Sequence, residues 1–179
     1  MGKARAGQPV KVWSAGCSTG QEAWSLAIAA REAGVAVEIV ATDLSQRSLE
    51  KARSGAYTGF EIQRGLKAET MLRCFDQAED AWIAKAELRA MVHFARANMV
   101  DPARDAHQFD IIFCRHLLGD ADPARRGEMF DNLERRLVDD GCLFLGPDEQ
   151  PDGDSIAFRP VAGRQGLFVK LPSALRRAA

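Results

Sequence analysis

The fold is decided by residues 10–29, which read VKVWSAGCSTGQEAWSLAIA. Val10, Val12 and Trp13 have the β-branched and aromatic side chains that are typical of a strand. Residues 14–20 are all small, so the backbone there can approach a ligand closely. The apolar residues that follow predict a buried helix. A strand, a small loop and a helix form the first unit of a nucleotide-binding βαβ fold.

The loop in this stretch does not carry the glycine pattern of a phosphate site. It contains only Gly16 and Gly20, it is not G-x-G-x-x-G, and it lacks the Gly-Lys-Ser/Thr of a P-loop. Free N–H groups at the start of the following helix hold polar ligand atoms. Glu22 lies in the first turn of that helix, where a carboxylate repels a phosphate and attracts a cation. This pattern favours S-adenosylmethionine (SAM), which has an amino group and no phosphate, over NAD.

The second strand is predicted at residues 37–43, and it ends in an acid. Its sequence, VEIVATD, is apolar enough for a buried parallel strand. Rossmann-like folds use a carboxylate about 20 residues past the glycine loop to accept hydrogen bonds from a ribose. We therefore assign Asp43 to the ribose hydroxyls. The alternative is that Asp43 caps the next helix, although Ser45 is better placed to be that N-cap.

The composition indicates one globular domain. The 179 residues are 46% hydrophobic and 27% charged, which is ordinary for a soluble protein with a sizeable core. A net charge of −1 and a pI of about 6.3 predict no nucleic-acid-binding surface. Four widely spaced cysteines and three histidines predict no metal site. With no signal peptide or membrane-spanning run in the sequence, we expect a cytoplasmic protein with reduced thiols and no integral membrane segment.

The rest of the chain continues the α/β pattern and predicts a mostly parallel sheet with a closing antiparallel hairpin. A helix is expected to begin at Asp122-Pro123, with aspartate as N-cap and proline at the first helical position. The remaining strands are predicted at residues 91–98, 109–116, 141–146 (after a glycine turn), 156–158 and 167–171. The domain organisation is predicted as a lead-in at residues 1–9, a domain at 10–171 with a small β excursion at about 71–94, and a tail at 172–179.

Residues 13–27, WSAGCSTGQEAWSLA, resemble the first motif of the chemotaxis receptor methyltransferases, the CheR family. The resemblance has no gaps in this motif and extends from about Val10 to Val169. It implies a Rossmann-like SAM-dependent methyltransferase fold and a protein-glutamate O-methyltransferase that releases S-adenosylhomocysteine (SAH). It also implies that the methyl acceptor is a chemoreceptor or another signalling protein, and that the small β-subdomain touches the receptor. The oligomeric state does not follow from it.

The resemblance adds four residues to the expected cofactor site. Asn98 and Met99 correspond to the family's Asn-Leu pair and would flank the adenine. Arg115 and His116 fall on the family's Cys-Arg-Asn motif and would line the pocket. Arg115 is also the candidate for steering the acceptor carboxylate, and no other catalytic residue is assigned. His116 could instead be a histidine of the core or of a loop. Four further contacts follow from the residues themselves: backbone approach at Ala15 and Gly16, the ligand amino group at Glu22, and the ribose at Asp43.

The sequence also departs from the family. Asp120 stands where the family has a tyrosine beside the transferred methyl group, and only nine residues precede the first strand, where the family usually has a small helical domain. The chain is then either a piece of a longer protein or a natural short form. Two functions stay open: a methyltransferase, or a non-catalytic module that binds SAM or SAH. An NAD-dependent dehydrogenase is disfavoured because the loop lacks the dinucleotide glycines.

Overall fold

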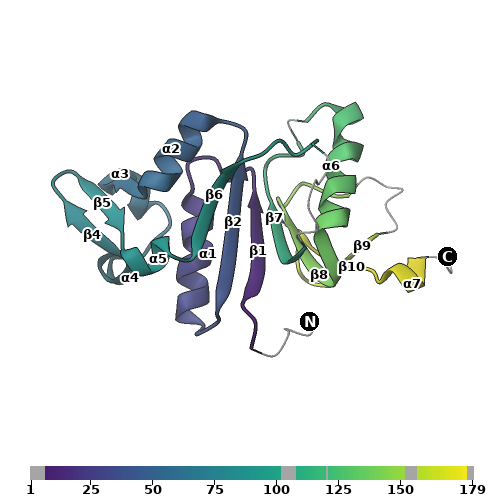
Figure 1. Cartoon of the computed structure of the whole chain (residues 1–179), viewed down its shortest axis with the longest axis horizontal. Coiled ribbons are helices and arrows are strands. Elements are labelled where there is room, and N and C mark those ends of the chain that lie inside the picture. The colour runs from purple at the N-terminus through teal and green to yellow at the C-terminus, as the bar shows by residue number, and fades with distance from the viewer. Residues whose placement is uncertain (1–6, 102–107, 120, 152–156, 177–179) are drawn as a thin grey trace.

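The computed structural model describes residues 7–101, 108–119, 121–151 and 157–176, and its centre is a seven-stranded sheet (Figure 1). The strand order is β6-β2-β1-β7-β8-β10-β9. The first five strands in this order pair in parallel, and β10 is antiparallel to both of its neighbours. The strands span Val10–Ala15 (β1), Val37–Asp43 (β2), Val92–Arg96 (β6), Phe109–Cys114 (β7), Leu137–Leu145 (β8), Phe158–Pro160 (β9) and Leu167–Lys170 (β10). The predicted α/β fold with its closing antiparallel hairpin is confirmed.

Two hydrophobic cores cover the two faces of this sheet, because alternate residues of a strand point to opposite faces. On one face, Val12 and Ile39 pack with helices α1 (Gln21–Glu32) and α2 (Gln46–Ser54). On the other face, Trp13 and Ile112 pack with α6 (Pro123–Arg136). Asp122 caps α6 as predicted, since its side chain accepts the N–H of Ala124. The sheet is therefore buried on both faces, as the apolar strand sequences indicate.

A second, three-stranded antiparallel sheet packs beside α1 (Figure 1). In the sequence it lies between α2 and β6. Its order is β3-β5-β4, and it begins at residue 56, earlier than the excursion expected at about 71–94. We call residues 56–89 the subdomain. Its elements are β3 (Ala56–Thr58), α3 (Gly59–Gln63), α4 (Ala68–Cys74), β4 (Phe75–Ala78), β5 (Ala81–Ala84) and α5 (Ala86–Arg89).

Several strand boundaries differ from the prediction. The strands β6 and β7 end at Arg96 and Cys114, so Asn98, Arg115 and His116 lie in loops beyond them. The glycine turn expected before residue 141 is wrong, because β8 begins directly after α6. The pairing of β7 with β8 is instead irregular along this part of β8, where Asp140 has a positive φ of 62°. Apolar periodicity does not distinguish such an irregular strand from a turn followed by a strand.

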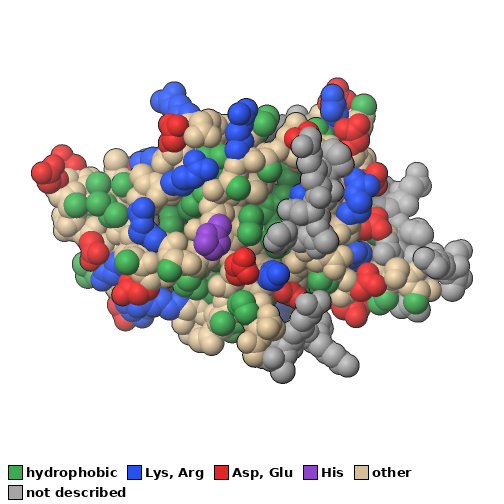
Figure 2. Space-filling view, in the orientation of Figure 1, with side chains coloured by type: hydrophobic (Ala, Val, Ile, Leu, Met, Phe, Trp, Pro, Cys, Tyr) green, Lys and Arg blue, Asp and Glu red, His purple; other side chains and the backbone are tan. Residues whose placement is uncertain are grey.

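The remaining features of the structure concern its surface charges, its last helix and the length of its helices. Acidic and basic side chains are interspersed on the face drawn in Figure 2. The segment expected as a tail contains a short helix, α7 (Ser173–Arg176). Among the described residues, no helix combines the length and the apolar character that crossing a membrane requires.

Candidate functional site

The loops after β1, β2, β6, β7 and β8 all leave the same edge of the sheet, because parallel strands end on one side. The order of the strands reverses between β1 and β7, and such a switch point is where open α/β sheets bind ligands. All eight residues predicted to contact the cofactor lie at this edge: Ala15 at the end of β1, Gly16 after it, Glu22 in the first turn of α1, Asp43 at the end of β2, Asn98 and Met99 after β6, and Arg115 and His116 after β7.

The loop between β1 and α1 presents bare backbone. Gly16 has a φ of +74°, and a Cβ at this position would lie 3.1 Å from the side chain of Leu117. The N–H of Gly16 donates to the carbonyl of Thr42 at 2.8 Å, which ties this loop to the end of β2. Gly20, the N-cap of α1, has no side chain to accept the N–H groups of the first helical turn. These groups suit the polar atoms of a ligand.

The side chain of Glu22 connects two elements of the site. The hydroxyl of Ser14 donates to Glu22 Oε1 at 2.9 Å, and Ser14 is completely buried. Arg115 Nη1 lies 3.3 Å from Glu22 Oε2, so two predicted residues that are 93 positions apart form an ion pair. Sequence reasoning missed Ser14, whose position within the small-residue loop gave no separate signal.

The carboxylate of Asp43 holds the surrounding loops. Its Oδ2 accepts the N–H of Ser18 at 2.7 Å, and its Oδ1 accepts the N–H of Ser45 at 2.9 Å. Ser45 is the N-cap of α2, as the sequence indicated, and its side chain accepts the N–H of Ser48. A carboxylate oxygen has two lone pairs, so each oxygen of Asp43 can accept a further hydrogen bond.

The segment that carries Asn98 and Met99 is fastened to α6 by a residue that sequence reasoning missed. Asn132 is buried, and its Nδ2 donates to the carbonyl of Met99 at 2.9 Å and to that of Asp101 at 3.3 Å. Asn98 Oδ1 accepts the N–H of Val100 at 3.3 Å. A polar residue on the apolar face of a predicted helix was the available signal, since a buried amide requires partners.

Glu149 is a third residue to which the sequence analysis assigned no role. Its carboxylate accepts four backbone N–H groups: Oε2 from Gly146 at 2.7 Å and His116 at 2.8 Å, and Oε1 from Leu118 at 2.8 Å and Gly119 at 3.3 Å. Burial alone would raise the pKa of this carboxyl, but the four hydrogen bonds outweigh burial and hold the pKa below its usual value. Glu149 thus joins the loop after β8 to the loop that carries Arg115 and His116.

His116 is an exposed loop residue with a φ of +58°, so the alternative of a core histidine is wrong. Asp120, which replaces the family's tyrosine, lies outside the described residues. No group of three or more His, Cys, Asp or Glu side chains that could hold a metal ion occurs in the described part of the chain.

Carboxylates contribute to the electrostatics of this edge. Burial raises the pKa of the Cys17 thiol to about 12, and the charges of Asp43 and Glu22 add to the shift. Burial also raises the pKa of Cys114, with contributions from Glu149 and Glu22. Burial is the main cause of both shifts, the nearby carboxylates add to them, and Arg53 opposes the shift of Cys17. Such a site fits SAM, whose sulfonium and amino groups are cationic, better than it fits a phosphate.

Three relatives show what the chain is similar to. It is 35% identical over 156 residues to the chemotaxis protein methyltransferase 1 of Pseudomonas aeruginosa, which covers 82% of this chain and 57% of the relative. It is 33% identical over 172 residues to a chemotaxis protein methyltransferase of Vibrio parahaemolyticus, which covers 92% and 62%. It is 30% identical over 198 residues to the probable biofilm formation methyltransferase WspC of P. aeruginosa, which covers 96% and 47%. The chain thus spans less than two thirds of the length of each.

Solved structures share the fold at low sequence identity. The CMeT domain of the citrinin polyketide synthase superposes with a TM-score of 0.54 at 20% identity, over 80% of this chain and 30% of that chain. The glycopeptide N-methyltransferase MtfA complexed with sinefungin superposes with a TM-score of 0.52 at 17% identity, over 79% and 44%. These neighbours establish the Rossmann-like SAM methyltransferase fold.

A family model decides the membership. The model described as "CheR methyltransferase, SAM binding domain" matches residues 1–167, which is nearly the whole chain. This match agrees with the bare loop after β1 and with the carboxylates around it. The chain belongs to the CheR methyltransferase family, as its SAM-binding domain.

Proposed function

We propose that this domain serves a protein-glutamate O-methyltransferase that uses SAM to modify a chemoreceptor or another signalling protein in the cytoplasm. The observation that carries the proposal is the placement of Glu22, in the first turn of α1, and Asp43, at the end of β2, at the same edge of the sheet as the bare backbone of residues 15–16. The names of the relatives support the chemotactic acceptor.

Each residue of the edge then has a role in cofactor binding. The backbone of Ala15 and Gly16 lies against the methionine part, and Glu22 accepts its amino group. Asp43 accepts the ribose hydroxyls with the lone pairs that Ser18 and Ser45 leave. The remaining roles are that Asn98 and Met99 flank the adenine, Arg115 and His116 line the pocket, and Asn132 and Glu149 hold the loops that carry these four residues.

The reaction demands alignment more than acid–base chemistry. When bound, SAM supplies an electrophilic methyl group on a sulfonium, which the acceptor carboxylate attacks in line, leaving SAH. A glutamate carboxylate is ionised at neutral pH, so no residue of this chain needs to act as a general base. Arg115 contributes a cation that can form a bidentate pair with the acceptor carboxylate once the amino group of the cofactor occupies Glu22.

The second candidate function is a module that binds SAM or SAH without methyl transfer. The replacement of the family's tyrosine by Asp120 favours it, because that tyrosine lies beside the transferred methyl group. The two functions share the cofactor site and differ in whether an acceptor is methylated.

Calorimetric titration with SAH tests the site. The parent chain is compared with Asp43→Asn and Asp43→Ala, with Asp80→Ala on the exposed turn between β4 and β5 as the control. Loss of the ribose hydrogen bonds is expected to weaken SAH binding by about tenfold or more in Asp43→Ala, and less in Asp43→Asn, which keeps one acceptor oxygen. Asp80→Ala should bind like the parent.

The results of this titration test the cofactor site, and a second assay distinguishes the enzyme from the binding module. Equal affinities for Asp43→Ala and Asp80→Ala would remove the ribose assignment, and no SAH binding by the parent chain would contradict the proposed site. A second assay with methyl-labelled SAM and the cytoplasmic part of a receptor measures base-labile methyl esters on the acceptor. Ester formation supports the enzyme, and cofactor binding without ester formation supports the module.

A further inference from the structure

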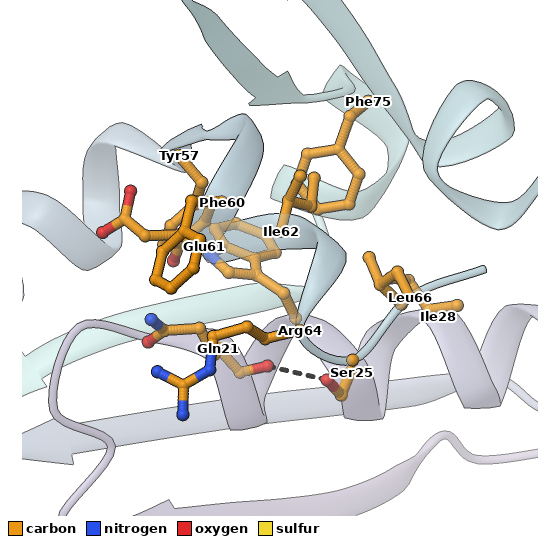
Figure 3. Close-up of a pocket in the computed structure, with 12 residues that line it drawn as sticks. Gln21, Ser25, Ile28, Tyr57, Phe60, Glu61, Ile62, Arg64, Leu66 and Phe75 are labelled. Carbon is orange, nitrogen blue, oxygen red and sulfur yellow. Dashed lines mark hydrogen bonds between the residues drawn. The ribbon is translucent and has the colours of Figure 1, made fainter. Parts of the chain in front are cut away.

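A pocket of about 320 Å³ lies between α1 and the subdomain, and Gln21 at the start of α1 is one of its lining residues (Figure 3). Trp24 and Ile28 of α1 line it, together with Tyr57, Ile62, Leu66 and Phe75 of the subdomain. Pockets that bind small molecules have volumes of roughly 300–1,000 Å³ and mostly apolar walls with a few polar groups. This pocket meets that description, and none of the eight residues assigned to the cofactor lines it.

The polar groups of the pocket gather at one end. In Figure 3 the side chains of Gln21 and Arg64 extend to one side, and Ile28 and Leu66 lie at the other. Arg64 lies 6.0 Å from the centroid of the Phe60 ring, and no carboxylate in the described ranges pairs with its guanidinium. Gln21 Oε1 accepts the hydroxyl of Thr19 at 2.6 Å, which leaves its NH₂ group for a ligand.

The other polar groups on the wall either are occupied or are donors. Glu61 already accepts the N–H of Thr58 at 2.7 Å and pairs with Lys51 at 3.2 Å. The indole N–H of Trp24 is buried and makes no hydrogen bond with the described residues. Burial raises the pKa of the nearby Tyr57 hydroxyl, and the indole N–H of Trp24 opposes this shift only in part. The NH₂ group of Gln21, the indole N–H of Trp24 and the guanidinium of Arg64 are therefore the donors that remain for a ligand. The guanidinium is also cationic.

We propose that this pocket binds a small monocarboxylate with an aryl or branched alkyl group, and that its occupancy is coupled to the cofactor site. The apolar group lies against Ile28, Leu66 and Phe75. The carboxylate accepts from Arg64 and Gln21, whose N–H groups face this end of the pocket. Glu61 also lines the pocket, but its carboxylate is held by the N–H of Thr58 and by Lys51.

The coupling follows from one contact with the loop before α1 and from the position of Gln21 in the sequence. The hydroxyl of Tyr57, on the wall of the pocket, donates to the carbonyl of Thr19 at 2.7 Å. Gln21 is the first residue of α1 and directly precedes Glu22. A ligand that orders Tyr57 and Gln21 also orders this loop, and linkage requires each ligand to raise the affinity for the other by the same factor. The coupling rests on the proposed function, because it assumes the cofactor site, whereas the assignment of the pocket does not.

The test uses 3-phenylpropanoate and its neutral analogue 3-phenylpropanamide in calorimetric titrations without cofactor. Arg64→Gln should weaken binding of the carboxylate by about fivefold, the effect of one partly exposed ion pair. It should leave the affinity for the amide unchanged. The matched control is Arg135→Gln on the exposed side of α6, which should bind both probes like the parent.

A blocking variant tests the location. Ser25 is an exposed residue of α1 at the wall of the pocket, so Ser25→Trp fills the pocket without changing the core. It should abolish binding of both probes while SAH binding is retained. No binding of the carboxylate up to about 10 mM by the parent, unchanged binding by Ser25→Trp, or equal losses for carboxylate and amide in Arg64→Gln would each overturn the proposal.

A final titration with SAH in the presence of saturating 3-phenylpropanoate tests the coupling. We expect the affinity for SAH to rise by at least about twofold, and an unchanged affinity would overturn the coupling. SAH is also titrated alone. Failure of SAH to bind while the probe binds would contradict the proposed function and leave the pocket assignment intact, whereas the reverse result would contradict the pocket alone.

Discussion

The carboxylate of Glu149 accepts the backbone N–H of His116 at 2.8 Å, across 33 positions of the chain. The same side chain holds the N–H groups of Leu118 and Gly119, so most of the loop after β7 is bound to one residue of the loop after β8. Arg115 precedes this clamped segment directly. The position of His116, which is proposed to line the cofactor site, therefore depends on Glu149, a residue that the sequence analysis did not assign to that site.

Replacement of Glu149 by glutamine should loosen this loop. A glutamine has one acceptor oxygen, and its NH₂ group would face backbone N–H donors, which leaves some of them without a partner. We expect the free energy of unfolding to fall by about 2 kcal/mol, measured by urea denaturation, and SAH binding to weaken. Glu128→Gln, which removes an exposed pair with Arg125, is the control and should change stability little. Equal stabilities of the two variants would contradict the clamp.

The same carboxyl predicts a dependence of stability on pH. Its pKa in the folded protein is lowered, so its contribution is fully present above the unfolded pKa of about 4.3 and is lost as the pH falls through the folded pKa. The difference in unfolding free energy between the parent and Glu149→Gln should therefore be constant near neutrality and shrink below about pH 4.3. Denaturation at a series of pH values measures this, and a difference that does not shrink in acid would refute the assignment.

The pair of Ser14 and Glu22 gives a prediction on affinity. Glu22→Gln removes the charge that the amino group of the cofactor requires, and SAH binding should weaken by about tenfold. Ser14→Ala removes only the hydroxyl that orients Glu22, so a smaller loss is expected. In the double variant the two losses should not add, because both act on one carboxylate. Additive losses in calorimetric titrations would mean that Ser14 acts independently of Glu22.

Gly20 gives a prediction on stability. Its φ is +93°, and a Cβ there would lie 2.8 Å from Cβ of Ala52, so Gly20→Ala suffers both backbone strain and a clash. Gly34 also has a positive φ of 64°, but a Cβ there would meet nothing within 4 Å. Gly34→Ala should cost about 1 kcal/mol of unfolding free energy, and Gly20→Ala clearly more. Similar thermal denaturation of the two variants would show that the clash relaxes.

Much of the fold could be predicted because its signals are local. The β-branched residues of β1 and β2, the small loop between β1 and α1, and the Asp-Pro pair before α6 each act within a few positions. The start of β8 was predicted wrongly, at Gly141, because an irregular strand and a turn followed by a strand have similar local sequences. The subdomain was placed too late because β3 has only three residues, too few for a clear alternation.

The sequence by itself determined the order of elements, the bare loop at residues 14–20 and the carboxylates that follow it, since these depend on side-chain size, charge and periodicity along the chain. The tertiary structure alone decided which side chains meet. Arg115 reaches Glu22 over 93 positions, Asn132 holds the carbonyl of Met99 over 33, and Glu149 gathers four N–H groups from two loops. Such contacts form only when pairing of the parallel strands brings the loops at their carboxyl ends together. Local sequence preferences do not set the distances between these loops.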